Sequence, residues 1–195
     1  MAPLPWRRRK ARPIPAALIV GALKQAFGDA RAELAAEFPE APRPGHLGWI
    51  LSVPDAQQET VLEALDGESA IRTLPCASED EASAIAAGLW IGGEPCALSI
   101  QHAGLYASLN TLRAVALDGG VPIFYVIGLR RREPRRNPRA SKHSAVRYCE
   151  PLLDTFGVPY TRLDGPEDVH RICEFFRLAQ VRRGPAAVLV GRQTC

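Results

Sequence analysis

The chain has 195 residues, of which 47% are hydrophobic and 23% charged, so it is the size of one globular domain with a full core. Its formal charge of +3 is too small to indicate a nucleic-acid partner. The five cysteines are odd in number and none forms a CxxC pair, which argues against a disulfide framework or a zinc site. No apolar run approaches the roughly 20 residues that span a bilayer. We therefore expect a cytoplasmic protein that binds neither nucleic acid nor membrane.

The chain begins with a basic stretch followed by a short apolar one, an order that imitates a secretory signal peptide. Two prolines, Pro13 and Pro15, interrupt the junction, and the apolar pattern continues with helical spacing into Phe27. The interpretation is therefore a disordered basic tail over residues 1–13, whose role the sequence leaves open. Residues 14–195 are then expected to form one domain.

Helical and strand patterns follow one another along that domain. The first helix is expected to run to Phe27, with Gly28 as a plausible break before more helix and a proline-rich loop. From residue 48 onwards strands and helices alternate, which indicates a mainly parallel six-stranded α/β sheet with helices on both faces. The expected strands are 48–53, 70–75, 95–100, 122–129, 159–163 and 185–191, and the expected helices are 55–67, 78–93, 109–120, 145–157 and 166–184. Asp55 is expected to cap the helix 55–67.

In such sheets ligands meet the loops that follow the carboxyl ends of the strands. Here those loops are PCASED, QHAGLY and GLRRREP, and the first leads into three consecutive acids, Glu79, Asp80 and Glu81. Ser78 followed by Glu81 has the spacing of a capping box, and acids in a first helical turn are favoured by the helix dipole. This explains Asp80 and Glu81 but gives Glu79 no required structural role.

The stretch SEDEASAIAAGLWIGGEPCALSIQHAGLYASLN, with the later VPIFYVIGLRRREP, resembles the pyrimidine-binding domain of thiamine-diphosphate enzymes. It is most similar to the alpha subunit, or amino-terminal half, of sulfopyruvate and phosphonopyruvate decarboxylases. Those proteins have a glutamate nine residues before the glycine of an AAG helix, as Glu79 stands before Gly88 here. Gln101, Gly104, Leu105 and Asn110 match their QNSGLGN turn, GLRRREP stands for their GWRGEP segment, and His143 fits a histidine later in that loop. The likeness covers about residues 48–195.

The resemblance implies a decarboxylase that uses thiamine diphosphate and converts an anionic 2-oxo acid to CO2 and an aldehyde. Glu79 would be catalytic, sharing a proton with N1′ of the cofactor's pyrimidine ring so that the cofactor can act as its own base. The matching turn residues would bind the cofactor. Arginines suit the substrate's sulfonate, phosphonate or carboxylate group. The residues expected to bind the substrate are Arg130, Arg131 and His143.

Two features depart from the family pattern. His102 and Ala103 replace Asn-Ser in the turn, and Tyr106 replaces its second glycine, which places the substrate more in question than the cofactor. Because a histidine side chain ordinarily titrates near neutrality, His102 is a candidate catalytic acid or base. The alternative is that His102 is a structural residue. The basic segment LRRREPRRNPR is either a solvated mobile loop or part of the substrate site.

A thiamine-diphosphate enzyme also needs a GDG motif for Mg2+ and the diphosphate, and no Asp-Gly pair of this chain follows a glycine. The resemblance therefore implies a beta subunit that supplies this site, in an α2β2 assembly or a multiple of it. A diverged carboligase subunit and a non-catalytic scaffold or regulatory subunit remain alternatives. An unrelated nucleotide-binding protein is disfavoured because no GxGxxG or GxxxxGK[ST] motif occurs.

Overall fold

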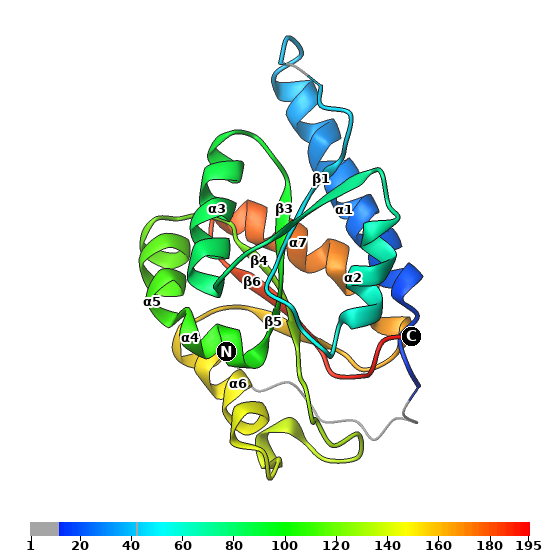
Figure 1. Ribbon diagram of the computed structural model, residues 1–195. Coiled ribbons are helices and arrows are strands. Elements are labelled where there is room, and N and C mark those ends of the chain that lie inside the picture. The colour runs from blue at the N-terminus through cyan, green and yellow to red at the C-terminus, as the bar shows by residue number, and fades with distance from the viewer. Residues whose placement is uncertain (1–11, 42) are drawn as a thin grey trace.

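The computed structural model describes residues 12–41 and 43–195, whose strands form one six-stranded sheet (Figure 1). All neighbouring strands are parallel, in the order β2-β1-β3-β4-β6-β5. The prediction of a mainly parallel six-stranded sheet is confirmed. The strands are β1 (Gly48–Ser52), β2 (Ile71–Pro75), β3 (Cys96–Gln101), β4 (Phe124–Gly128), β5 (Tyr160–Leu163) and β6 (Ala186–Val190).

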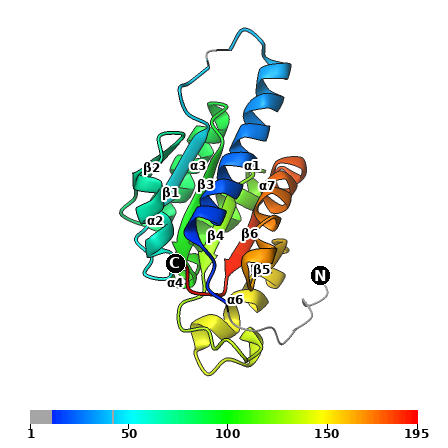
Figure 2. The ribbon, with the colours of Figure 1, turned by 90° about the vertical axis from the view of Figure 1, so that its right-hand side faces the viewer.

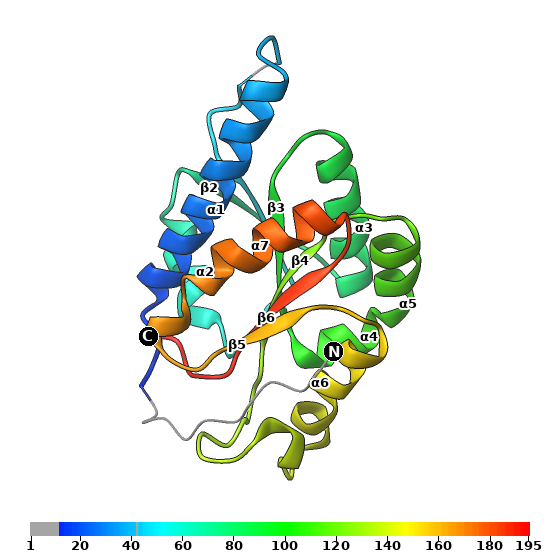
Figure 3. The same cartoon turned by 180° about the vertical axis from the view of Figure 1, so that it is seen from behind.

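Helices cover both faces of the sheet, as predicted. Figure 3 shows α1 and α7 crossing one face, whereas Figure 1 shows α3, α4 and α6 on the other side. The helices are α1 (Ala16–Glu37), α2 (Glu59–Asp66), α3 (Glu79–Ile91), α4 (His102–Ala107), α5 (Leu109–Thr111), α6 (Ser144–Thr155) and α7 (Arg171–Arg182), with a π-helical turn η1 (Leu112–Asp118) and two 3-10 turns, η2 (Pro138–Ala140) and η3 (Pro166–Asp168).

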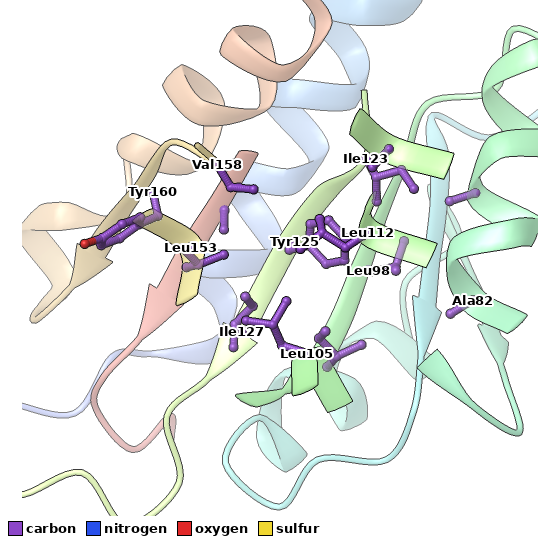
Figure 4. Packing of buried hydrophobic residues seen from close by; sticks show 14 of the residues in the cluster. Ala82, Leu98, Leu105, Leu112, Ile123, Tyr125, Ile127, Leu153, Val158 and Tyr160 are labelled. Carbon is purple, nitrogen blue, oxygen red and sulfur yellow. The ribbon is translucent and has the colours of Figure 1, made fainter. Parts of the chain in front are cut away.

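The strands bury both of their faces, which is why they read as continuous apolar runs. Side chains alternate along β4, because successive strand residues point to opposite faces. Tyr125 and Ile127 pack with α3, α4, η1 and α6, and Figure 4 shows Tyr125 beside Leu112 in this layer. Phe124 and Val126 pack instead with α1, α2 and α7. Two cores therefore hold the sheet between its helices.

The strand order reverses beside β1, because β2 lies on one side of β1 and β3 on the other. The loops that leave β1 and β3 consequently diverge at this point, which is where doubly wound sheets form a crevice. Figure 2 shows the sheet between its helix layers, with the carboxyl ends of the strands at the lower end of the molecule. The candidate site lies on this carboxyl edge.

Three local predictions were wrong in detail. Helix α1 runs through Gly28 without a break, and the QHAGLY turn forms the short helix α4 directly after β3. Asp55 does not cap α2, because that helix begins only at Glu59. Its N-cap residue is Gln58, whose side chain makes no capping hydrogen bond. Asp55 instead accepts a hydrogen bond from the backbone N–H of Gln57.

The predicted cap of α3 is confirmed in one half. The hydroxyl of Ser78 accepts the N–H of Glu81 at 3.2 Å. The carboxylate of Glu81 accepts the N–H of Ala77 at 2.6 Å rather than that of Ser78, so it caps the chain one residue earlier than expected.

The basic tail predicted for residues 1–13 falls largely on residues 1–11, which lie outside the described residues. Arg12 is exposed and forms an ion pair with Glu167 at 3.0 Å. Ile14 is fully buried and pairs with Thr194 through a β-bridge, so the two ends of the described chain are fastened to each other. Among the described residues, no helix combines the length and apolar character needed to cross a membrane.

A buried ion-pair cluster anchors the loop between β4 and α6. Glu150 of α6 is fully buried, and its carboxylate accepts hydrogen bonds from Nε and Nη2 of Arg162 at 2.6 and 2.7 Å. Arg139, which comes from the loop, donates to Glu150 at 3.0 Å, to the hydroxyl of Tyr160 at 2.8 Å and to Asp154. One part of the basic segment is therefore held against α6 and β5, although Arg130, Arg131, Arg135 and Arg136 are exposed.

Glu150→Gln should lower the free energy of unfolding by about 3–5 kcal/mol, because it leaves two arginines facing a group that no longer carries a charge. Urea denaturation of the purified chain measures this. Asp118→Asn is the matched control, since it removes one partner of an ion pair with Arg113 whose side chains are 53% and 64% exposed. The control should change the free energy of unfolding by less than about 1 kcal/mol. Equal losses in the two variants would contradict the anchoring role.

Candidate functional site

A buried carboxylate lies where the sheet order reverses. Asp55, which follows β1, is 3% exposed. Its Oδ1 accepts the N–H of Gln57 and Nε2 of Gln101, both at 2.9 Å, and its Oδ2 accepts Nε2 of Gln58 at 3.2 Å. The loop after β1 is thereby joined to the end of β3, and the carboxylate is surrounded by N–H donors.

Gly128 makes room for this carboxylate at the end of β4. A Cβ atom built on Gly128 would lie 1.9 Å from Oδ2 of Asp55 and 3.0 Å from Cβ of Gln57. Any side chain at this position would push Asp55 aside. The end of β4 therefore has to be a glycine for Asp55 to lie across it.

His102 is the first residue of α4 and is 5% exposed. Its pKa is lowered below 6.5, chiefly because burial disfavours the charged ring. A hydrogen bond with the backbone of Arg130 and the negative charge of Asp55 oppose this effect, whereas the charge of Arg130 adds to it. Nδ1 has no hydrogen-bond partner among the described residues. His102 is therefore a neutral imidazole at pH 7, with Asp55 close enough to influence its titration.

Glu79 lies against Gly104, a glycine of the turn that the family resemblance matches separately. Glu79 is the first residue of α3 and is half-buried. A Cβ atom on Gly104 of α4 would lie 1.9 Å from Oε1 of Glu79 and 2.2 Å from its Cδ. The carboxylate accordingly fills the space above Gly104, beside the carboxyl end of β3. Two motif positions that are 25 residues apart in the chain are thus in contact.

The three acids at the start of α3 have different surroundings. Asp80 accepts the hydroxyl of Thr111, and Glu81 accepts the N–H of Ala77. Within the part of the chain that the structure describes, the Glu79 carboxylate accepts no hydrogen bond. The half-buried carboxylate of Glu79 therefore lies at the positive end of the helix dipole without a hydrogen-bond donor from these residues.

The other predicted site residues lie at different depths. Gln101 binds Asp55, whereas Leu105 is fully buried in the core beside the sheet. Asn110 is exposed and accepts Nη2 of Arg113 at 3.1 Å. The structure therefore groups Gln101 and Gly104 with Glu79 and His102 on the carboxyl edge. Leu105 instead packs in the core, and Asn110 makes a hydrogen bond on the surface.

The predicted substrate-binding residues flank this edge. Arg130 and Arg131 are exposed just after β4, and Arg131 has a left-handed backbone with φ of 64°. His143 is half-buried at the start of α6, and its N–H donates to the hydroxyl of Ser141 at 3.1 Å. Among the described residues, no three His, Cys, Asp or Glu side chains are gathered as metal ligands.

Sequence reasoning missed Asp55 and Gln58. The loops expected to meet a ligand follow the second, third and fourth strands, and the sequence indicates only a helix cap for Asp55. The available signal was the position of a carboxylate directly after a buried strand, followed by the polar pair Gln57 and Gln58. The reversal of the strand order at β1 was the missing information.

A doubly wound parallel sheet with a carboxylate site at the switch of strand order is consistent with a pyrimidine-binding domain of thiamine-diphosphate enzymes. No protein-family model matches the chain. The chain is, however, similar to curated sulfopyruvate decarboxylase alpha subunits from three organisms, and the resemblance inferred from its motifs is confirmed at that level.

The similarity extends over much of the chain. The alpha subunit of Methanococcus maripaludis is 26% identical over 124 residues, which are 64% of this chain and 73% of the relative. The alpha subunit of Methanocaldococcus jannaschii is 24% identical over 139 residues, which are 69% of this chain and 79% of the relative. That of Methanothermobacter thermautotrophicus is 32% identical over 84 residues, or 43% and 51%.

The lowered pKa of His102 makes stability depend on pH. Below pH 6.5 the unfolded chain takes up a proton at His102 more readily than the folded chain. The contribution of the neutral His102 to the free energy of unfolding is therefore complete above this pH and is lost as the pH decreases. Between pH 7.5 and 5.5 wild type should lose up to about 1.4 kcal/mol more free energy of unfolding than His102→Gln. Urea unfolding at both pH values measures the difference. The same pH dependence in both proteins would contradict a buried neutral His102.

Proposed function

We propose that this chain is the alpha subunit of a thiamine-diphosphate-dependent decarboxylase that acts on an anionic 2-oxo acid. The observation that carries the proposal is the contact between the Glu79 carboxylate and Gly104 on the carboxyl edge of the sheet. The similar alpha subunits are named sulfopyruvate decarboxylase, which supports the same reaction. A sulfopyruvate- or phosphonopyruvate-like substrate is proposed from the motif resemblance.

The residues of this edge suit the cofactor's pyrimidine ring. Glu79 has a carboxylate that no described residue binds, at the mouth of a helix and above a glycine that leaves it room. Glu79 would hold a proton at N1′ of the ring. When bound, thiamine diphosphate supplies the carbon nucleophile and the electron sink for loss of CO2 from a 2-oxo acid. Gln101 and Gly104 would lie beside the ring.

His102 would act on the substrate side of this site. Because it is neutral at pH 7, it can accept a proton, and burial keeps water from competing for it. Arg130, Arg131 and His143 would hold the sulfonate, phosphonate or carboxylate group, since two of them are exposed guanidinium groups at the same edge. The products would be CO2 and an aldehyde.

The site would be completed by a beta subunit that carries Mg2+ and the diphosphate, in an α2β2 assembly or a multiple of it. The absence of a GDG motif from the sequence supports this division of labour. One observation favours a diverged substrate or a carboligase: Tyr106 stands where the family has a glycine, and its hydroxyl donates to the carbonyl of Ala145 at 2.9 Å. That bond places an aromatic ring between α4 and α6.

Affinity capture of the chain from its native cells, followed by mass spectrometry and cofactor analysis, tests the proposal. We expect a stoichiometric partner with a GDG motif, together with thiamine diphosphate and Mg2+. The captured complex is then given a panel of 2-oxo acids, and an aldehyde with CO2 indicates decarboxylation whereas an acyloin indicates carboligation. A chain captured alone and without cofactor would contradict the proposal. A complex that keeps full turnover after loss of the Glu79 carboxylate would indicate a scaffold subunit.

Glu79→Gln in the reconstituted complex should lower kcat by roughly 100- to 10,000-fold, because the amide cannot share a proton with N1′ in the same way. Glu81→Gln is the matched control, since it makes the same change one half-turn along the helix, where the carboxylate only accepts the N–H of Ala77. Steady-state kinetics with the best 2-oxo acid should show the control within about twofold of wild type. Equal losses would mean that α3 is simply sensitive to charge.

Gly104→Ala tests the contact itself. The new methyl group would displace the Glu79 carboxylate, which is the flexible end of a side chain, so we expect the fold to be retained. Cofactor affinity and kcat should fall, by roughly 100-fold in kcat for a displacement of about 1 Å. Gly88→Ala in α3 is the control, because a Cβ atom there meets nothing within 4 Å. Unchanged kinetics in Gly104→Ala would show that the position of Glu79 is unimportant.

A further inference from the structure

Gln58 occupies an unusual position for a polar side chain. It is completely buried at the carboxyl edge, directly before α2. Its Nε2 lies 3.2 Å from Oδ2 of Asp55, 3.2 Å from the carbonyl of Ile100 and 3.1 Å from the carbonyl of Val126. A single amide group therefore joins the Asp55 carboxylate to carbonyls of β3 and β4.

The orientation of this amide is fixed by its neighbours. All three groups around Nε2 are hydrogen-bond acceptors, so the amide cannot be turned over without placing its oxygen against them. Its Oε1 has no hydrogen-bond partner among the described residues, and a buried group in this state costs about 1–3 kcal/mol. An apolar side chain of similar shape would avoid that cost, but it would leave the Oδ2 atom of Asp55 and the two carbonyls without this donor. The glutamine is therefore accounted for by the acceptors that it serves, and the charged one among them is Asp55.

The carboxylate that Gln58 binds acts in turn on His102. Oδ1 of Asp55 accepts Nε2 of Gln101, the residue directly before His102, so the carboxylate lies at the start of α4. The charged groups that influence the pKa of the His102 ring are Asp55 and Arg130. Gln101 holds Oδ1 of Asp55 and Gln58 holds Oδ2, while Gly128 leaves the space in which the carboxylate lies. Only a fixed carboxylate gives His102 a constant electrostatic environment.

We propose that Gln58 is a positioning residue, which fixes the Asp55 carboxylate beside His102 at the carboxyl edge. This inference rests on the proposed function in placing the reaction at that edge. Gln58 touches neither substrate nor cofactor and acts only through Asp55. Its removal should therefore matter only while Asp55 carries its charge.

The first test needs no enzymatic activity. Histidine ring signals of the purified chain are followed by NMR as the pH is changed, in wild type, Asp55→Asn, Gln58→Met and the double variant. Because the Asp55 charge raises the pKa of His102, Asp55→Asn should move the His102 titration to lower pH. Gln58→Met should move it in the same direction, and the double variant should match Asp55→Asn.

Gln57→Met is the matched control for this titration. The neighbouring Gln57 donates its Nε2 to the carbonyl of Arg192 at 2.7 Å, and its side chain does not bind Asp55. Its His102 titration should equal that of wild type. If Gln58→Met does not fold, Gln101→Met removes the other side-chain donor to Asp55 and should give the same downward shift. An unchanged His102 titration in a folded Gln58→Met or Gln101→Met variant would overturn the proposal.

The second test uses kinetics of the reconstituted complex. Gln58→Met should lower kcat by roughly 10- to 100-fold in wild type, as expected for a misplaced group, but by less than about twofold in Asp55→Asn. Equal factors in both backgrounds would overturn the proposal, because they would show that Gln58 acts independently of Asp55. A complex without decarboxylase activity would contradict the proposed function, whereas the titration would still decide the role of Gln58.

Discussion

The parallel arrangement of all six strands is the constraint on which the rest of the structure depends. It brings every strand's carboxyl end to one edge, so that residues far apart in the sequence meet there. The reversal of the strand order at β1 then separates the loops that follow β1 and β3 and leaves space for Asp55. Both faces of the sheet are covered by packed helices, which makes this edge rigid enough to hold side chains in defined positions.

Two glycines shape the site on that edge. Gly104 leaves the space that the Glu79 carboxylate fills, and Gly128 does the same for Asp55. The two carboxylates differ in what they bind: Asp55 is surrounded by three N–H donors, whereas no described residue binds the carboxylate of Glu79. Asp55 is therefore held inside the protein, while Glu79 is available to a ligand or a partner chain. The negative charge of Asp55 also raises the pKa of His102, against the larger effect of burial.

The sequence predicted the sheet and the start of α3 well, since apolar runs and capping residues are local signals. The contact between Glu79 and Gly104 was not expected, because no local pattern relates the two residues and the family resemblance only placed each of them in its own motif. Asp55 was interpreted as a cap because its partners, Gln101 and the end of β4, come from distant strands. The pairing of Arg139 with the buried Glu150 was equally hidden, since a run of arginines and prolines does not indicate such a partner. Composition and periodicity do not indicate which residues far apart in the sequence lie in contact.

A structure of the captured complex with thiamine diphosphate bound would test the central claim most directly. We expect N1′ of the pyrimidine ring to lie within hydrogen-bond distance of the Glu79 carboxylate, above Gly104, with a second chain covering the carboxyl edge. A cofactor bound elsewhere, or a complex in which Glu79 makes no contact with the cofactor, would contradict this expectation.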